Sequence, residues 1–344
     1  MNFQILDPTQ HPNWDELLVS ITGSTFFHTS SWARVLKEAY GFTPKYFTEF
    51  DANRISTLIP LMEVPTSFRG RKGISLPFTD YCDPLVSDKI NFQEALNVVL
   101  AEGKERNWKY LELRNIKDLS PFAFPSLTYL GHTLNLSNKE DQIFSSFRDS
   151  TRRNIKKAVK EGVKAEINNS LESVKKFYKL NCMTRKQHGL PPQPFRFFEK
   201  MHGIVVSKNL GNVILGSYGQ EAIAGAVFLH FNNKAVFKYG ASDIAYQKLR
   251  ANNLVMWEAI KWYSQKGYKS LCFGRTEPEN HGLIQFKSGW GTTEKKINYY
   301  QYDFGKQGFI SGRSRVTGFH NKIFRRMPIP LLRAIGSIFY KHLG

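Results

Sequence analysis

The sequence predicts a mixed α/β protein made of two copies of one domain, and three repeated features support this prediction. In each half, a strand containing small residues is followed by an amphipathic helix that leads directly into another strand. These segments are residues 54–61, 92–106 and 108–114 in the first half and 222–229, 254–266 and 268–275 in the second. The last strand of each half ends in Arg114 or Arg275, and an aspartate, Asp80 or Asp243, stands in the turn-rich stretch before each helix. Because these features recur in the same order at an offset of roughly 165 residues, they indicate an internal repeat.

The composition is that of a folded protein with a strong positive charge. A length of 344 residues suits two domains that each bury a core. Apolar residues make up 41% of the chain and aromatic residues 14%, which excludes a disordered chain. The net charge of +19 attracts phosphates, nucleic acid or an anionic membrane surface.

The spacing of cysteines and histidines predicts neither a disulfide framework nor a metal site. Cys82, Cys182 and Cys272 lie far apart without a CxxC pair, and the nine histidines form no HxxxH or HExxH motif. The amino terminus lacks the basic and apolar regions of a secretory signal, and no uncharged run of about 18 apolar residues is present. We therefore expect a cytoplasmic protein with no metal or redox cofactor.

The first domain is predicted to span residues 1–148. A helix begins at Ser30 and Ser31, which suit an N-cap, and it ends at Gly41. The elements that follow are strands at 44–50 and 54–64, a turn at 69–73, and a strand and turn at 76–84. Two prolines exclude a regular helix from the last of these segments.

The second domain is predicted to span residues 149–304 and to begin with a basic linker helix over 151–161. Asp149 or Ser150 caps this helix and Gly162 closes it. One face is cationic, formed by Arg153, Lys156, Lys157, Lys160 and Lys164, while the other packs through Ile155, Ala158 and Val159. The cationic face either binds anions or is simply solvated. The remaining elements are helices at 171–186, 196–208 and 254–266, a meander of strands at 213–218, 222–231 and 234–240, and strands at 270–273 and 297–303.

Residues 305–344 are predicted to form a basic amphipathic tail. They hold eight Lys or Arg and no Asp or Glu, and the apolar residues of 329–343 alternate with cations such as Arg333 and Lys341. A segment of this kind suits the surface of an anionic bilayer. The alternative is a helix docked on the domain with its charges exposed. We expect membrane contact through residues 305–344, which places the protein peripherally at the inner face of the cell membrane.

The stretch that joins the strand at 234–240 to the helix at 254–266 is the first candidate for chemistry. A helix N-terminus presents backbone N–H groups and the positive end of the dipole to an anion. Lys248 and Arg250 add charge there, which favours a phosphate. The alternative is that Asn252 or Asn253 simply caps the helix and that the basic residues are surface residues.

Two further candidates combine a charged residue with a loop. Arg275 ends a strand next to a glycine-containing loop, in which Lys287 stands between Phe286 and Trp290. Such a lysine either stabilises an oxyanion or a carboxylate, or only packs against its aromatic neighbours. Asp80 lies in a turn between aromatic residues within the 76–84 stretch, and it acts either as a general base toward an amine or only as a turn cap.

Four motifs resemble the FemABX family. They are FHTSSW at residues 27–32, RRNIKKA with a following GV at 152–163, YGAS at 239–242 and FKSGWG at 286–291. The resemblance covers about residues 3–304 and implies two tandem GNAT-like acyltransferase domains, each a mixed sheet flanked by helices. The best-known members of the family move an amino acid from aminoacyl-tRNA to the peptide of a UDP-linked or lipid-linked cell-wall precursor. Relatives lie in exopolysaccharide gene clusters.

The resemblance also implies roles for individual residues. Lys37, five positions after Trp32, is similar to a precursor-binding lysine of the family, and Lys287 matches a lysine of the second domain. Asp80 matches the aspartate of an Arg-Gly-Pro-x-x-Asp pattern whose Arg-Gly is absent here. The stretch 247–252 lacks the glycines of the GNAT loop Q/R-x-x-G-x-G/A, which argues against a standard CoA pyrophosphate loop.

We therefore expect a FemAB-type transferase that joins an amino acid or acyl group to an amine of a cell-envelope precursor. Asp80 and Lys287 are the predicted catalytic residues, acting on the amine and on the oxyanion. The predicted substrate-binding residues are Lys37, Arg153, Asp243, Lys248, Arg250 and Arg275. The donor is aminoacyl-tRNA or, in the first alternative, acyl-CoA used by an N-acyltransferase of exopolysaccharide biosynthesis. The second alternative is a non-catalytic basic protein that binds RNA or lipid.

Overall fold

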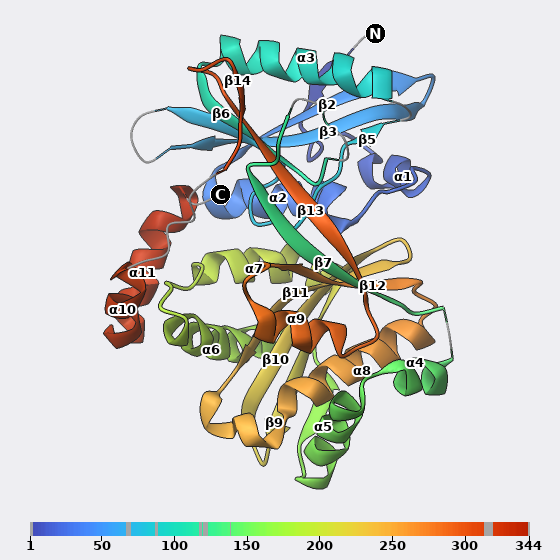
Figure 1. The fold of residues 1–344 in the computed structure, drawn as a ribbon, viewed down its shortest axis with the longest axis vertical. Coiled ribbons are helices and arrows are strands. Elements are labelled where there is room, and N and C mark those ends of the chain that lie inside the picture. The colour runs from blue at the N-terminus through green and yellow to red at the C-terminus, as the bar shows by residue number, and fades with distance from the viewer. Residues whose placement is uncertain are drawn as a thin grey trace. The chain divides into compact units, whose positions relative to one another are not determined.

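The structure, a computed structural model, describes residues 3–66, 70–86, 89–116, 119, 123–137, 139–312 and 319–342. It contains two compact units (Figure 1). Unit 1 comprises residues 1–129, 296–315 and 339–344, and unit 2 comprises residues 130–295 and 316–338. Each unit thus combines segments that are far apart in the chain, whereas the linear division at residues 148 and 304 stays a prediction.

Unit 1 is an antiparallel sheet with one parallel pair. Its strands are β1 (Gln4–Leu6), β2 (Thr43–Asp51), β3 (Arg54–Pro65), β4 (Arg71–Ile74), β5 (Leu85–Val86), β6 (Trp108–Arg114), the later part of β13 (Thr293–Asp303) and β14 (Gly308–Ile310). The strand order is β1-β2-β3-β4-β6-β13, with β5 on β3 and β14 on β13, and β4 runs parallel to β6. Its helices are α1 (Trp14–Val19), α2 (Ser30–Tyr40), α3 (Lys89–Glu105) and the short 3-10 helix η1 (Phe26–His28).

One hydrophobic core of unit 1 lies between α3 and the sheet (Figure 1). Trp108 is central to it, because its indole N–H donates to a carboxylate oxygen of Glu63 at 2.8 Å while its ring lies over the backbone of Gly73. A Cβ atom at Gly73 would stand 2.3 Å from that ring. The missing side chain of Gly73 permits this close packing. The prediction that residues 71–73 form part of a turn is wrong, because these residues belong to strand β4.

Unit 2 is a mixed sheet covered by helices on both faces. Its strands are β7 (Leu127–Asn135), β8 (Lys164–Ile167), β9 (Gly211–Tyr218), β10 (Glu221–Phe231), β11 (Lys234–Ser242) and β12 (Ser270–Thr276), in the order β7-β12-β11-β10-β9-β8. Its helices are α4 (Glu140–Ser146), α5 (Asp149–Lys160), α6 (Leu171–Gln187), α7 (Phe195–Ile204), α8 (Ala251–Gln265) and α9 (His281–Ser288), with 3-10 turns η2 (Val206–Lys208) and η3 (Ile244–Leu249).

Two glycines mark the opposite faces of the unit 2 sheet. Gly216 faces Val255 of α8, whereas Gly225, on the neighbouring strand, faces Phe177 of α6. Helix α5 packs on α8 through Ile155 and Ala158, so the linker helix belongs to the α8 face. The expectation that Val159 also packs is wrong, since this side chain is 59% exposed.

The predicted fold is confirmed, and the meander of β9, β10 and β11 lies where the sequence placed it. Strands β1, β7, β8 and β14 and helices α1 and α4 were missed, and the prediction of a strand within residues 76–84 is wrong, since this stretch forms turns and bends. Residues 281–288, predicted as a loop, form helix α9, whose N-cap Asn280 accepts a hydrogen bond from the backbone of Leu283. The helix predicted to continue to Lys208 ends at Ile204.

The tail forms two helices, α10 (Phe319–Arg326) and α11 (Ile329–Phe339), followed by the short helix η4 (Tyr340–His342). Helix α11 packs in unit 2 through Leu332 and Gly336, and a Cβ at Gly336 would lie 2.0 Å from the carbonyl oxygen of Pro192. Among the described residues, no helix is long and apolar enough to cross a membrane.

Candidate functional site

In unit 2, the parallel strands β11 and β12 separate after a short contact. Their pairing runs only from Lys234 opposite Ser270 to Val236 opposite Cys272, although the strands extend to Ser242 and Thr276. On its other edge β12 changes register against β7 between Cys272 and Arg275, where Gly274 has a φ of 71°. The carboxyl ends of β11 and β12 therefore diverge, and each strand is followed by a loop that carries polar residues.

The loop after β11 ends at the N-terminus of α8. Asp243 caps η3, its side chain accepting from the backbone N–H of Ala245 at 2.9 Å, so it acts here as a turn residue. Arg250 is the N-cap of α8 with a φ of 60°, and its side chain makes no capping hydrogen bond. The alternative in which Asn252 or Asn253 caps this helix is therefore wrong. Lys248 and Arg250 are both exposed beside the first turn of α8, an arrangement that favours an anion.

Lys287 lies on α9 and is 3% exposed, so its description as a loop residue is wrong. Its ammonium donates to the carbonyl oxygens of Gly274 at 3.1 Å and Arg275 at 3.0 Å. The lysine thereby holds the irregular end of β12 through backbone groups. Arg275 contributes its carbonyl to this arrangement, and its side chain is half-buried.

A histidine that sequence reasoning did not select lies near this lysine. His132 of β7 has a fully buried side chain, and its Nε2 atom is 3.3 Å from a carboxylate oxygen of Glu294. Burial, reinforced by the charge of Lys287, lowers the pKa of His132, and Glu294 acts in the opposite direction. A single histidine without a motif gives no sequence signal, and only the pairing of β7 with β12 brings it here.

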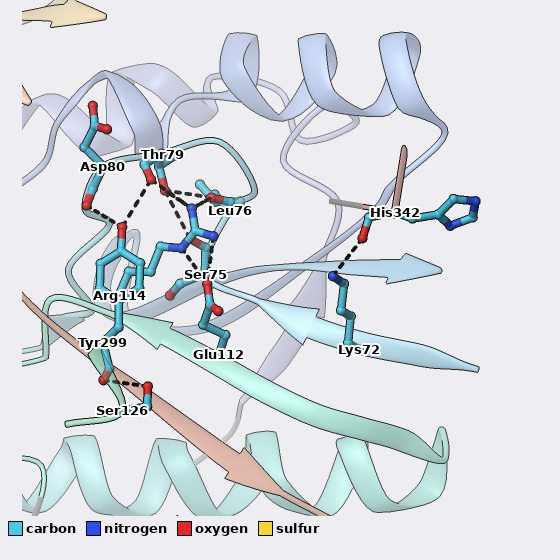
Figure 2. A network of polar contacts seen from close by, with 10 residues as sticks. All are labelled: Lys72, Ser75, Leu76, Thr79, Asp80, Glu112, Arg114, Ser126, Tyr299 and His342. Carbon is cyan, nitrogen blue, oxygen red and sulfur yellow. Dashed lines mark hydrogen bonds and ion pairs between the residues drawn. The ribbon is translucent and has the colours of Figure 1, made fainter. Parts of the chain in front are cut away.

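In unit 1, a buried arginine organises the loop that carries Asp80 (Figure 2). The guanidinium of Arg114 binds one carboxylate oxygen of Glu112 through two N–H groups, at 2.9 and 2.7 Å. It also donates to the carbonyl oxygens of Leu76 at 3.1 Å and Thr79 at 2.8 Å. The loop needs such support because Leu76 and Phe78 adopt left-handed backbone conformations, with φ of 50° and 61°.

Asp80 is held in place through its backbone. The hydroxyl of Tyr299 donates to the Asp80 carbonyl oxygen at 2.7 Å, and its ring lies 5.2 Å from the Arg114 guanidinium. The side chain of Asp80 is half-buried and points away from the Arg114 network in Figure 2. The loop therefore fixes the position of this carboxylate and leaves it outside the Glu112–Arg114 ion pair.

Two other predicted residues lie elsewhere. Lys37 of α2 forms an ion pair with Asp7 at 2.6 Å. Burial alone would raise the pKa of Asp7, but hydrogen bonds from Lys37 and Thr9 hold it below its usual value. Arg153 is exposed on α5, in the cationic face that also contains Lys156 and Lys160.

The structure thus groups the unit 2 candidates at two places. Asp243, Lys248 and Arg250 lie around the start of α8, and Arg275 and Lys287 meet at the end of β12. Asp80 and Lys287 belong to different units, so their joint action stays a prediction.

Comparison with known proteins relates this chain to GNAT domains. The model of an acetyltransferase (GNAT) domain matches residues 145–288. The chain is similar to the lipid II:glycine glycyltransferases of Staphylococcus haemolyticus strain JCSC1435 and Staphylococcus epidermidis strain RP62A, with 31% identity over 87 residues in both cases. This similarity covers 23% of the chain and 21% of each relative, so the chain matches only about a fifth of the length of these curated relatives.

Similarity to solved structures extends over almost the whole chain. The crystal structure of FemX superimposes with a TM-score of 0.68 at 15% identity, covering 89% of this chain and 98% of FemX. A tandem GNAT protein from the clavulanic acid biosynthesis pathway superimposes with a TM-score of 0.57 at 8% identity, covering 88% and 98% of the two chains. These similarities show that the fold is a tandem GNAT arrangement like that of FemX.

Proposed function

We propose that this FemABX-like tandem GNAT protein is a transferase that joins an aminoacyl or acyl group to an amine of a cell-envelope precursor. The observation that carries the proposal is the coincidence of two similarities in one chain. The fold follows FemX over 89% of the chain, and an 87-residue stretch is 31% identical to lipid II:glycine glycyltransferases. A precursor of the peptidoglycan class is therefore the acceptor that the comparisons support best.

In the proposed reaction, the acceptor amine attacks the carbonyl carbon of an ester or thioester. A C–N bond forms, the C–O or C–S bond breaks, and the amine proton must leave while the donor alcohol or thiol gains one. We assign the amine to Asp80, whose loop is fixed by Arg114 and Tyr299, as the residue that positions or deprotonates it. We assign the developing oxyanion to the buried ammonium of Lys287.

The donor is assigned to the diverging strand ends of unit 2. Phosphates of aminoacyl-tRNA or of a coenzyme suit the start of α8, where Lys248 and Arg250 are exposed. Arg275 and the cationic face of α5, including Arg153, are further phosphate partners in this proposal. Asp243 acts by capping η3 and so by shaping this loop.

A second candidate keeps the fold and changes the donor to acyl-CoA. The match of residues 145–288 to a GNAT acetyltransferase domain favours it, as does the early separation of β11 from β12. In this case the product would be an N-acylated amine, for example on an amino sugar of an exopolysaccharide precursor.

One transfer assay separates the candidates. The purified chain is incubated with an extract of lipid-linked and UDP-linked precursors, and with either tRNA charged with labelled amino acids or labelled acyl-CoAs. RNase-sensitive label in the precursor fraction would support aminoacyl transfer, and label from acyl-CoA alone would support the second candidate. Absence of label from both donors, with a precursor fraction that a known transferase does label, would contradict both and favour a basic binding protein.

A matched pair of variants tests the site within the same assay. Asp80→Asn is expected to reduce transfer by at least about 100-fold, because removing a general base costs 10²–10⁴ in rate. Asp243→Asn makes the same chemical change at a turn cap, a position that asparagine also fills, and is expected to keep activity. Full activity of Asp80→Asn would remove Asp80 from the mechanism without affecting the identity of the donor.

A further inference from the structure

The last helices of unit 2 expose apolar and cationic side chains together. On α10, Lys322, Arg325 and Arg326 are exposed, and Ile323 is 45% exposed. Among the described residues, ten large apolar side chains are exposed, and four of them lie within residues 319–342. The concentration of exposed apolar surface in so short a segment calls for an explanation, since single exposed apolar residues are ordinary but clusters mark contact surfaces.

Packing of α11 against unit 2 accounts for the apolar side chains on only one face of this helix. Leu332 and Gly336 are buried in unit 2, where Gly336 meets the backbone of Pro192. Leu331 and Ile338, seven positions apart and thus on one helical face, are 50% and 60% exposed. The helix therefore has one apolar face that the protein covers and another that it leaves uncovered.

The charge of the segment identifies the chemistry of what it contacts. Residues 305–344 hold eight Lys or Arg and no Asp or Glu. At 11 residues, α11 is about half the length that a membrane-spanning helix needs. A short helix with an exposed apolar face and neighbouring cations is suited to the boundary between lipid headgroups and acyl chains.

We propose that α10 and α11 form an interfacial element that rests on an anionic lipid bilayer. Ile323, Leu331 and Ile338 enter the headgroup boundary, while Lys322, Arg325 and Arg326 bind lipid phosphates. An RNA partner would satisfy the cations but leave the aliphatic side chains in water, because RNA-binding surfaces use aromatic or planar groups against bases. This property does not depend on the transfer reaction.

The test is flotation of the full chain with two kinds of vesicle. Binding is expected with phosphatidylcholine vesicles that contain phosphatidylglycerol, and much weaker binding with phosphatidylcholine alone. The triple variant Lys322→Gln, Arg325→Gln, Arg326→Gln is expected to lower the partition coefficient by about 100-fold, since each cation near an anionic surface contributes about 5-fold. The double variant Leu331→Asn, Ile338→Asn is expected to weaken binding at all salt concentrations, because it removes the apolar contribution.

Matched variants on α5 serve as controls. Lys156→Gln, Lys157→Gln, Lys160→Gln removes the same charge from another exposed helix of unit 2, and Val159→Asn removes an equally exposed apolar side chain. Both are expected to bind vesicles like the unchanged chain. If the α5 triple variant loses binding as strongly as the tail variant, attraction is a property of net charge alone and the proposal is wrong.

Two other outcomes would also overturn it. One is failure of the unchanged chain to float with anionic vesicles. The other is tail-dependent binding to RNA without binding to vesicles. Transfer to a soluble acceptor without a lipid group is expected to be the same for the tail variants and the unchanged chain. Failure of the lipid proposal and failure of the transfer proposal are therefore distinguishable.

Discussion

Both units bury a cation at the end of the strand that follows their long helix, but they satisfy its charge differently. In unit 1, Arg114 of β6 binds the buried carboxylate of Glu112 as well as two carbonyl oxygens of the Asp80 loop. In unit 2, Lys287 comes from a separate helix, α9, and binds the carbonyl oxygens of Gly274 and Arg275. The cation of unit 1 belongs to an ion pair, whereas that of unit 2 is held by peptide carbonyl groups near His132, whose pKa is lowered by burial and by the charge of Lys287.

The parallel strand pairs differ in the same way. In unit 1, the backbone N–H of Ser75 donates to the carbonyl oxygen of Glu112 at 2.8 Å, so contact with β6 continues beyond the end of β4. In unit 2, pairing between β11 and β12 ends at Val236 and Cys272. Unit 1 therefore uses its buried cation to close a strand end, and unit 2 places its buried cation beside strands that have separated. This difference is consistent with a stabilising role for Arg114, and it bears on the oxyanion role proposed above for Lys287.

The largest effect is expected from Arg114→Met. This change leaves the carboxylate of Glu112 buried without its partner, which costs about 3–5 kcal/mol in the free energy of unfolding. Urea unfolding of the purified chain measures it. Lys37→Met, which breaks the partly exposed pair with Asp7, is the control and is expected to cost at most about 1 kcal/mol.

A double variant sharpens the first prediction. Adding Glu112→Gln to Arg114→Met removes the buried charge, so part of the lost stability is expected to return. A double variant that is less stable than the sum of the single changes would contradict the view that the stranded carboxylate causes the loss.

The second effect in size is expected from Lys287→Met. Two carbonyl oxygens lose a charged donor, which costs about 2–3 kcal/mol, and transfer activity is expected to fall much further than the folded fraction. Lys287→Arg keeps the charge and is expected to recover stability better than activity. If Lys287→Met remains folded and keeps full activity in the transfer assay, Lys287 has the same structural role as Arg114 and the contrast between the units fails.

Much of the cation site of unit 1 can be predicted from the sequence. Glu112 and Arg114 are two positions apart on a predicted strand, so they share a face and can pair. The repeat likewise predicted both domains, because it depends on hydrophobic patterns and turn residues that lie close together in the chain. The features that the sequence predicts well are therefore those formed by residues that lie close together in the chain.

The unit 2 site depends on contacts between distant segments, and sequence patterns do not report these. Lys287 binds the backbone of residues 274 and 275, and backbone partners leave no residue signature. His132 joins them from β7 through strand pairing alone. The prediction of a turn at residues 71–73 was wrong because glycine is found both in turns and at sites of close packing. At Gly73 the absence of a side chain makes room for the ring of Trp108.

The third prediction concerns the two aspartates that the repeat made equivalent. Asp243→Ala removes the cap of η3 and is expected to cost about 1 kcal/mol, while Asp243→Asn is expected to cost little. Asp80→Ala is expected to change stability less than Asp243→Ala, because the main-chain oxygen of Asp80, and not its carboxylate, receives the Tyr299 hydroxyl. Thermal unfolding of the four proteins, including the unchanged chain, measures the order. A larger loss for Asp80→Ala would show that its carboxylate, too, is structural.

The smallest effect is a difference in acid sensitivity between the units. Burial lowers the pKa of His230 below 6.5, with the Asn209 carbonyl acting in the opposite direction, and the pKa values of His132 and His188 are also lowered. All three histidines belong to unit 2. An unfolded chain binds their protons more readily than the folded one, so unit 2 loses stability as the pH falls below about 6.5 and keeps it above that value. Asp7 of unit 1 has a lowered carboxyl pKa, so its contribution is lost only as the pH falls below about 3.8.

Hydrogen exchange between pH 7.5 and 5 is therefore expected to show weakening of the unit 2 sheet before that of unit 1, after correction for the intrinsic exchange rate. His230→Gln is expected to flatten this dependence in unit 2, and an unchanged slope in that variant would mean that His230 does not titrate on unfolding.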